Sequence, residues 1–294
     1  MSFGELGGGL QPLDGGWSGE TFLADAGGDR SVVRVFANPR HHPQAAEIQE
    51  ALHRLVRGLV AVPAVLEVRR ADPAAGMPAL LVTEFVEGAR ADQVLSTLDE
   101  TSLADLGRRL GQIAGTLAGM PFLTAGTFVD GDLRVDPFAL DLPEWVESHA
   151  ERLDWSTADL DALRDVAASA QDLLYTVTRV SLVHSDLNPK NIVVDPHSLQ
   201  VRAVLDWEFT HAGSPFTDLG NLLRFDRDAA YVAGVLEGYV AQRGGSARAA
   251  LDLARAADLF ALVELAARRT ANPVAARAHD LLHTIARRED IHAD

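Results

Sequence analysis

The balance between strand-like and helix-like segments changes at Gly88, and this change constrains the fold more than any other feature of the 294-residue chain. Before Gly88, short β-branched segments separated by glycine turns predict strands at 20–24, 31–36, 65–68 and 79–85. Apolar residues at helical spacing predict one helix from Pro43 to about Leu59. The first part of the chain is therefore expected to be a small antiparallel β unit with a single helix.

Alanine- and leucine-rich helices dominate the chain after Gly88. Their apolar spacing predicts helices at 101–120, 143–153 and 157–177, and through nearly everything after Asp218. One compact β-rich segment, residues 180–206, interrupts them. We therefore expect an α+β fold of two lobes, 1–88 and 89–294.

Composition excludes several classes of function. The net charge of −16 repels phosphate backbones and anionic lipids, so we expect no nucleic-acid partner and no membrane partner. The sequence has no apolar stretch long enough to cross a bilayer and no signal-peptide pattern at its start. The absence of cysteine rules out disulfides and thiolate metal sites and fits a cytoplasmic protein. The acidic charge favours a cationic small-molecule ligand, or it serves solubility alone; the oligomeric state stays open.

The segment around residues 182–195 carries the residues best suited to chemistry. Asp186 and Asn191 lie five residues apart, and Asp206 follows at the end of the next expected strand. Phosphoryl transfer needs a group that orients the attacking hydroxyl and oxygen ligands for Mg²⁺. Apolar residues on both sides of the loop would fix it between short buried strands.

These motifs resemble a known family. His184-x-Asp186 with Asn191, followed by Asp206-Trp207-Glu208, is similar to the signature of aminoglycoside phosphotransferases and related small-molecule kinases. The similarity continues through 212–224 and covers roughly residues 10–225. It implies a two-lobed protein-kinase-like fold, with a small antiparallel β lobe and a large, mainly helical lobe. It also implies an ATP-dependent phosphotransferase, with ATP or GTP as the donor and an alcohol group as the acceptor.

The resemblance assigns roles in and after the loop. Asp186 resembles the catalytic base, and Asn191 and Asp206 resemble the Mg²⁺ ligands. His184 is expected to be a buried support of the loop, and Asp218 to brace the loop or to cap a helix.

A second group of expected contacts concerns the nucleotide. Ser18 and Gly19, in a glycine-rich turn, would lie over the phosphates. Arg34 stands where kinases carry a lysine for the α- and β-phosphates, with Glu47 as its expected partner and Glu50 as the alternative.

The resemblance also places a purine contact after the last strand of the first lobe. The backbone at Glu84 and Val86 is expected to bond the base. The role of Lys190 stays open. Because Lys190 is the only lysine and follows a proline, no Gly-Lys-Ser/Thr motif exists, which excludes a P-loop enzyme.

The acceptor is the least determined part of the prediction. The acidic charge favours an aminoglycoside or another cationic antibiotic, which would make the protein an antibiotic-resistance enzyme. A metabolic kinase for an amino alcohol, a sugar or a vitamin is the alternative. A catalytically silent binding protein would have to lack the base or a metal ligand, and all three residues are present.

Overall fold

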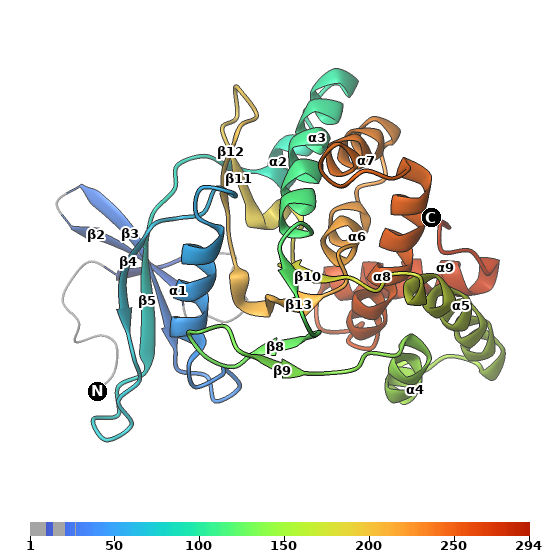
Figure 1. The fold of residues 1–294 in the computed structure, drawn as a ribbon, viewed down its shortest axis with the longest axis horizontal. Helices are drawn as coiled ribbons and strands as arrows, with labels where there is room; N and C mark the ends of the chain where they lie inside the picture. Colours follow the sequence, from blue (N-terminus) through green and yellow to red (C-terminus); the bar gives the residue numbers. More distant parts are fainter. Residues whose placement is uncertain (1–9, 14–20, 27) are drawn as a thin grey trace. The chain divides into compact units, whose positions relative to one another are not determined.

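The computed structural model describes residues 10–13, 21–26 and 28–294 of the chain (Figure 1). These residues form two compact units. The first unit contains 1–97, 127–136 and 189–210, and the second contains 98–126, 137–188 and 211–294. The predicted α+β class is confirmed, with an antiparallel sheet in the N-terminal part and helices in the C-terminal part.

The first unit is built on a five-stranded antiparallel sheet in the order β1-β2-β3-β5-β4. Its strands are β1 (Leu10–Pro12), β2 (Thr21–Ala26), β3 (Asp29–Phe36), β4 (Val65–Arg69) and β5 (Ala79–Glu84). Helix α1 (Ala45–Val56) covers one face of this sheet (Figure 1). Ala46 of α1 packs there against Phe36, Ala79 and Leu81, because the apolar positions of the helix share one stripe. The helix is shorter than the predicted 43–59, since the backbone turns extended at Arg57.

A three-stranded sheet in the order β12-β11-β6 completes the first unit. It joins β6 (Ala89–Arg90) to β11 (Ile192–Val194) and β12 (Val201–Val204), beside the short helix α2 (Ala91–Leu95). Gly88 allows this pairing: its φ is 153°, and a Cβ there would lie 2.6 Å from the carbonyl oxygen of Val194. Because β11 and β12 pair with β6, residues 189–210 belong to the first unit although they follow long helical segments in sequence.

The second unit is mainly helical. Its helices are α3 (Glu100–Leu117), α4 (Leu142–Leu153), α5 (Thr157–Tyr175), α6 (Thr217–Leu223), α7 (Ala229–Arg243), α8 (Ala247–Ala266) and α9 (Pro273–Arg288). It also contains β7 (Pro121–Phe122), β10 (Val180–Val183) and β13 (His211–Gly213), paired in that order. Two further strands, β8 (Gly126–Phe128) and β9 (Val135–Pro137), lie where the chain passes from one unit to the other.

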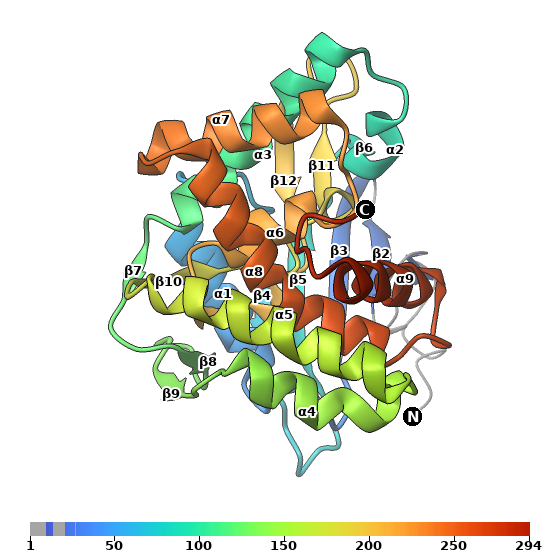
Figure 2. The same cartoon turned by 90° about the vertical axis from the view of Figure 1, so that its right-hand side faces the viewer.

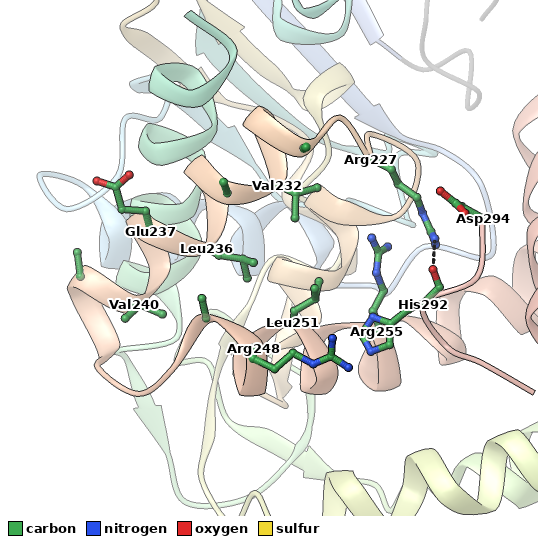
Figure 3. Close-up of a pocket in the computed structure, with 14 residues that line it drawn as sticks. Arg227, Val232, Leu236, Glu237, Val240, Arg248, Leu251, Arg255, His292 and Asp294 are labelled. Atoms are coloured by element: carbon green, nitrogen blue, oxygen red, sulfur yellow. Dashed lines mark hydrogen bonds between the residues drawn. The ribbon is translucent and has the colours of Figure 1, made fainter. Parts of the chain in front are cut away.

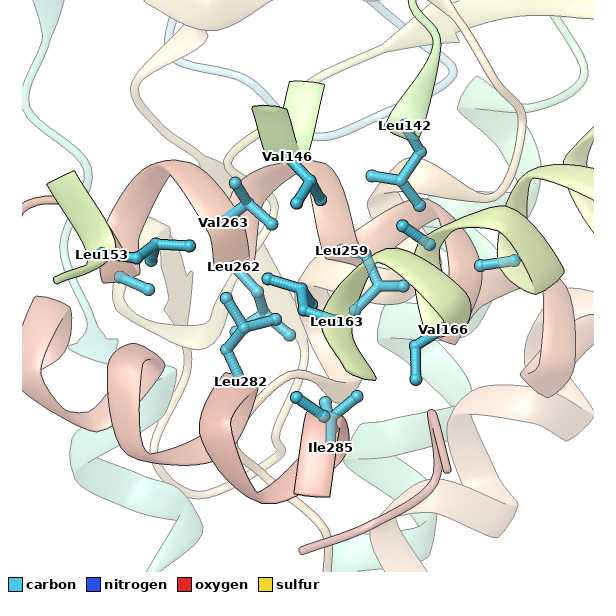
Figure 4. Close-up of a cluster of buried hydrophobic side chains, with 14 of the residues drawn as sticks. Leu142, Val146, Leu153, Leu163, Val166, Leu259, Leu262, Val263, Leu282 and Ile285 are labelled. Carbon is cyan, nitrogen blue, oxygen red and sulfur yellow. The ribbon is translucent and has the colours of Figure 1, made fainter. Parts of the chain in front are cut away.

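The main core of the helical unit lies between α4, α5, α8 and α9. Figure 2 shows α4 and α5 running side by side, and Figure 4 shows the apolar side chains that the four helices share. Leu163, Leu259 and Leu282 are almost completely buried in this cluster. In the part of the chain that the structure describes, no helix has the length and apolar character needed to cross a membrane.

Glycines allow α3 and α7 to pack with their backbones in contact. A Cβ at Gly111 of α3 would lie 2.0 Å from the carbonyl oxygen of Val235, and one at Gly238 of α7 would lie 2.0 Å from that of Arg108. A Cβ at Gly107 would lie 2.6 Å from the carbonyl oxygen of Tyr231, and one at Gly234 would lie 2.2 Å from that of Ala104. No side chain fits at these positions unless the two helices separate.

We expect Gly111→Ala to lower the free energy of unfolding by about 1–3 kcal/mol, because the added methyl group overlaps a rigid backbone. Helix propensity alone predicts the opposite sign, a gain of roughly 1 kcal/mol. Chemical denaturation of the two proteins measures the difference. Thr101→Ala, on the exposed first turn of the same helix, serves as the control. An unchanged or raised stability for Gly111→Ala would contradict this account of the α3–α7 contact.

Candidate active site

The hairpin of β11 and β12 brings Asn191 and the segment of Asp206 to the same end of the small sheet. Ile192 pairs with Val204, so the residues just outside the strands face each other, and the N–H of Leu205 donates to the carbonyl oxygen of Asn191 at 2.8 Å. Asn191 is buried at the end of a short 3₁₀ helix, Pro189–Asn191. The two proposed metal ligands therefore lie near each other within the first unit.

The backbone at Asp206 turns sharply as β12 ends. Asp206 has φ 64° and ψ 64°, a left-handed conformation that aspartate tolerates better than most side chains. The next residue, Trp207, is fully buried, and its indole N–H donates to the carbonyl oxygen of Val204 at 3.0 Å. The buried indole anchors the turn that carries Asp206.

Arg34 binds two carboxylates of this turn. From the middle of β3, its Nη1 donates to Oδ1 of Asp206 at 2.7 Å, and its Nη2 donates to Oε2 of Glu208. The Arg34 side chain is only 14% exposed, so the guanidinium is largely removed from water and is compensated by the two acidic groups. Sequence reasoning gave Glu208 no role, although the residue follows Asp206 by two positions.

Glu47, the expected partner of Arg34, contacts a different arginine in this structure. Its Oε1 lies 3.3 Å from Nε of Arg70, which is a highly exposed side chain. Its Oε2 is buried without a hydrogen-bond partner. Asp206 and Glu208 hold the guanidinium here, because both carboxylates follow the strand β12 directly. The Arg34–Glu47 pair, with Glu50 as the alternative, stays a prediction for the nucleotide-bound protein.

The structure describes two of the four other residues expected to contact the nucleotide. Glu84 is the last residue of β5, and its N–H donates to the carbonyl oxygen of Ala64 at 2.9 Å. A purine contact at Glu84 would therefore use the carbonyl group. Val86 follows in the half-buried segment beyond the strand. Ser18 and Gly19 lie outside the residues that the structure describes.

Asp218 binds the backbone of the loop formed by residues 184–188, within the helical unit. The N–H of His184 donates to its Oδ2 at 2.9 Å, and the N–H of Ser185 donates to its Oδ1 at 2.8 Å. Ser185 has φ 69°, an uncommon conformation for a residue with a side chain. The two hydrogen bonds to one buried carboxylate stabilise this turn of the loop.

Two polar neighbours surround the carboxyl group and the backbone of Asp186. The amide Nδ2 of Asn188 donates to Oδ1 of Asp186 at 2.6 Å. The N–H of Asp186 donates to Nδ1 of His184 at 3.3 Å, and His184 is completely buried. The Asp186 side chain therefore has a defined direction within the loop. Asn188 was not identified from sequence, although an asparagine two residues after an aspartate is a recognisable turn signal.

A buried polar chain continues from the loop into α8. Oδ1 of Asn221 accepts the N–H of Leu187 at 3.2 Å, and Nδ2 of Asn221 lies 3.5 Å from Oδ1 of Asp258. Asp258 also binds Arg224, with Nη2 2.7 Å from Oδ1, and both side chains are buried. Gly220 makes the approach possible, since a Cβ there would lie 2.6 Å from the carbonyl oxygen of Ala254. No local sequence pattern indicates such a chain, because its members are far apart in sequence.

Asn191 and Asp206 fit a Mg²⁺ ion by their chemistry. Amide and carboxylate oxygens are hard ligands, and Mg²⁺ commonly takes only one or two from the protein, with the remainder from phosphates and water. The guanidinium of Arg34 against Asp206 shows that this carboxylate already attracts a cation. Among the described residues, no group of three or more histidine, cysteine or acidic side chains is placed to hold a metal ion.

Burial raises the pKa of Asp218 from its usual 3.8 to about 7, although the two backbone N–H bonds favour the ionised form. Between these pH values the folded protein retains a proton that the unfolded chain has lost. The contribution of Asp218 to stability is therefore complete below about pH 4 and is lost as the pH rises through about 7.

We expect the stability advantage of the wild type over Asp218→Asn to shrink as the pH rises from about 5 to about 8, because only the wild type ionises there. Urea unfolding of both proteins across this pH range measures the difference in their free energies of unfolding. Asp161→Asn, at an exposed side chain, should show no such trend. An advantage that grows with pH would mean that the ionised carboxylate is the stable form.

Comparison with known proteins identifies the family to which the sequence is similar. A sequence model of the phosphotransferase enzyme family matches residues 9–259. Among curated protein sequences, no relative matches the chain.

Solved structures show the fold. A thermostable mutant of aminoglycoside phosphotransferase APH(4)-Ia is 17% identical with a TM-score of 0.64, and the match covers 96% of this chain and 95% of that one. A microcompartment-associated aminopropanol kinase is 21% identical, with a TM-score of 0.61 and 95% and 91% coverage. Choline kinase LicA from Streptococcus pneumoniae is 18% identical, with a TM-score of 0.60 and 93% and 91% coverage. The protein-kinase-like fold predicted from the motifs is confirmed. Because the family match spans most of its length, the chain belongs to the phosphotransferase enzyme family.

Proposed function

We propose that this protein transfers the γ-phosphoryl group of ATP or GTP to a hydroxyl group of a small cationic molecule. The observation that carries the proposal is the loop at residues 184–188, whose backbone is bound by the buried Asp218 and whose Asp186 carboxylate is oriented by Asn188. A positioned carboxylate on a rigid support is what a phosphotransferase needs to orient an attacking hydroxyl.

Asp186 is assigned the role of the base. Its carboxylate would accept a hydrogen bond from the acceptor hydroxyl and take the proton as the oxygen attacks the γ-phosphorus. Asn188 would keep Oδ1 in place during this step, because its amide already donates to that atom. His184 and Asp218 would act through the loop backbone and not on the substrate.

Asn191 and Asp206 are assigned to Mg²⁺, which would neutralise charge on the nucleotide phosphates. Arg34 would place a positive charge beside Asp206 for the same phosphates. Glu208 would keep one side of the guanidinium fixed, since it binds Nη2 while Asp206 binds Nη1. The backbone at Glu84 and Val86 would hold the purine, with Ser18 and Gly19 over the phosphates.

We place the protein in the cytoplasm, because an enzyme of this kind depends on nucleotides.

Two classes of acceptor deserve testing. The charge of −16 favours an aminoglycoside or another cationic antibiotic, because an acidic surface attracts polycations. The fold match to an aminopropanol kinase and a choline kinase favours a small amino alcohol as the second candidate. Both classes combine a hydroxyl group with a positive charge, and the proposal covers both.

The test is nucleotide turnover with Mg²⁺, ATP or GTP, and a panel of acceptors. The panel contains aminoglycosides, cationic peptide antibiotics, small amino alcohols, and neutral sugars and macrolides. We expect turnover with a cationic member, and we expect the KM of a polycationic acceptor to rise as salt increases from about 0.05 to 0.5 M, because salt screens surface charge.

Asp186→Asn should lower kcat by roughly 10²-fold or more while nucleotide binding is retained, the scale expected for losing a positioned base. Asp161→Asn, at an exposed position of α5, is the matched control and should leave turnover unchanged. Full activity in Asp186→Asn would remove the proposed base. Turnover of neutral acceptors alone would refute the cationic class, and no turnover with any acceptor or nucleotide would refute the activity.

A further inference from the structure

The helical unit contains a pocket that the proposed reaction does not use. Its volume is about 990 Å³, at the upper end of the roughly 300–1,000 Å³ range of small-molecule sites. It lies between α7, α8 and the residues that follow α9 (Figure 3). Apolar side chains line it from both helices, with Val232, Leu236 and Val240 on α7 and Leu251 on α8.

Arginines gather at one end of this pocket. Figure 3 shows Arg227, Arg248 and Arg255 there, beside His292 and Asp294. Arg248 has a carboxylate partner outside the pocket, since its Nε lies 2.9 Å from Oδ1 of Asp252. Within the described part of the chain, Arg227 and Arg255 donate only to backbone carbonyl groups and form no ion pair.

The two arginines without a carboxylate partner are also withdrawn from water. Arg255 is 7% exposed; its Nη1 donates to the carbonyl oxygen of Leu223, and its Nε has no hydrogen-bond partner. Arg227 is half-buried; its Nη1 donates to the carbonyl oxygen of Ala293 at 2.6 Å, and its Nη2 has no partner. Burying a guanidinium is costly unless an anion compensates it.

The charged groups around Arg227 and Arg255 would favour an anion. Burial lowers the pKa of Arg255 to about 10 and also lowers the pKa of Arg227, and the proximity of Arg227 lowers that of Arg255 further. Asp258 and Asp294 attract both groups, but Asp258 is already paired with Arg224 and Asp294 forms no ion pair with either arginine. Glu237 is the other acidic residue of the lining. In a chain of net charge −16, the two guanidinium groups are therefore bound by no carboxylate of the described residues, and each keeps a buried nitrogen without a partner.

The geometry points to a binding site for a small amphipathic anion, with its carboxylate or phosphate against Arg227 and Arg255 and its apolar body along Val232, Leu236 and Leu251. An uncharged ligand of the same shape would leave the guanidinium groups without an anion, and a cation would be repelled. None of the residues that line the pocket has a role in the proposed phosphoryl transfer, and occupation of the site does not depend on that activity.

Isothermal titration calorimetry of the whole chain with octanoate tests the proposal. Octyl phosphate distinguishes the two kinds of head group, and 1-octanol and octylammonium are matched ligands without the negative charge. We expect one octanoate per chain, with 1-octanol bound at least about tenfold more weakly, since a charge-assisted hydrogen bond is lost. Octylammonium should bind more weakly still, because the arginines repel its positive charge. Inorganic phosphate alone should also bind weakly, because it has no apolar body.

Two variants separate the charge from the apolar wall. Arg255→Met should weaken octanoate by about tenfold or more, and it should fold, because it removes a buried charge that has no counter-ion. Leu251→Trp keeps both arginines but fills the apolar side, and it should weaken octanoate without a change in net charge. Arg268→Gln, an exposed arginine just beyond α8, is the control and should bind octanoate like the wild type.

Several results would overturn the inference. Equal affinity for octanoate and 1-octanol would show that the arginines do not select an anion. Unchanged octanoate affinity in both Arg255→Met and Leu251→Trp would place the ligand elsewhere. If no anion of the series binds and light scattering shows a self-association that these variants abolish, the pocket is an interface between copies of the chain.

Discussion

The structure of the loop that carries Asp186 depends on one buried carboxylate. Asp218, at the start of α6, accepts the backbone N–H groups of both His184 and Ser185, and it is 3% exposed. Through these two bonds α6 fixes a turn that Ser185 would seldom adopt alone. Asn221, one turn further along α6, holds the next part of the loop and connects it to Asp258 of α8. The backbone of the loop is therefore held by α6 and, through Asn221, by α8, whereas the Asp186 carboxylate is oriented by Asn188 within the loop.

In the first unit, the central interaction is the ion pairing of Arg34 with two carboxylates. The turn after β12 places two carboxylates, Asp206 and Glu208, against the guanidinium of Arg34. Because Asn191 lies at the same end of the hairpin, this corner combines a cation with the oxygen ligands that Mg²⁺ prefers. The close approach of Gly88 to β11 holds the hairpin in the first unit.

Local patterns in the sequence were sufficient for four strands of the first sheet, β2 to β5, and for helix α1 between β3 and β4. The β-branched segments and the helical periodicity gave β3, β4, β5 and α1 with small errors at their ends. The contacts of Arg34 in this structure were not predictable in the same way, because sequence reasoning considered Glu47 and Glu50 and only the three-dimensional turn after β12 brings Asp206 and Glu208 to the guanidinium. The pair Arg224–Asp258 and the contact at Gly220 depend on how α6 meets α8, and no local pattern encodes that contact.

The central claim is that Asn191 and Asp206 hold the divalent ion of a metal nucleotide. Electron paramagnetic resonance of Mn²⁺, titrated into the protein with a non-hydrolysable ATP analogue, tests it without relying on turnover. Asp206→Ala and Asn191→Ala should each weaken Mn²⁺ binding by about tenfold or more, since a site with two protein ligands loses one. Asp195→Ala, beyond the other end of β11, should leave binding unchanged. Equal Mn²⁺ affinity in the wild type and in both ligand variants would contradict the account.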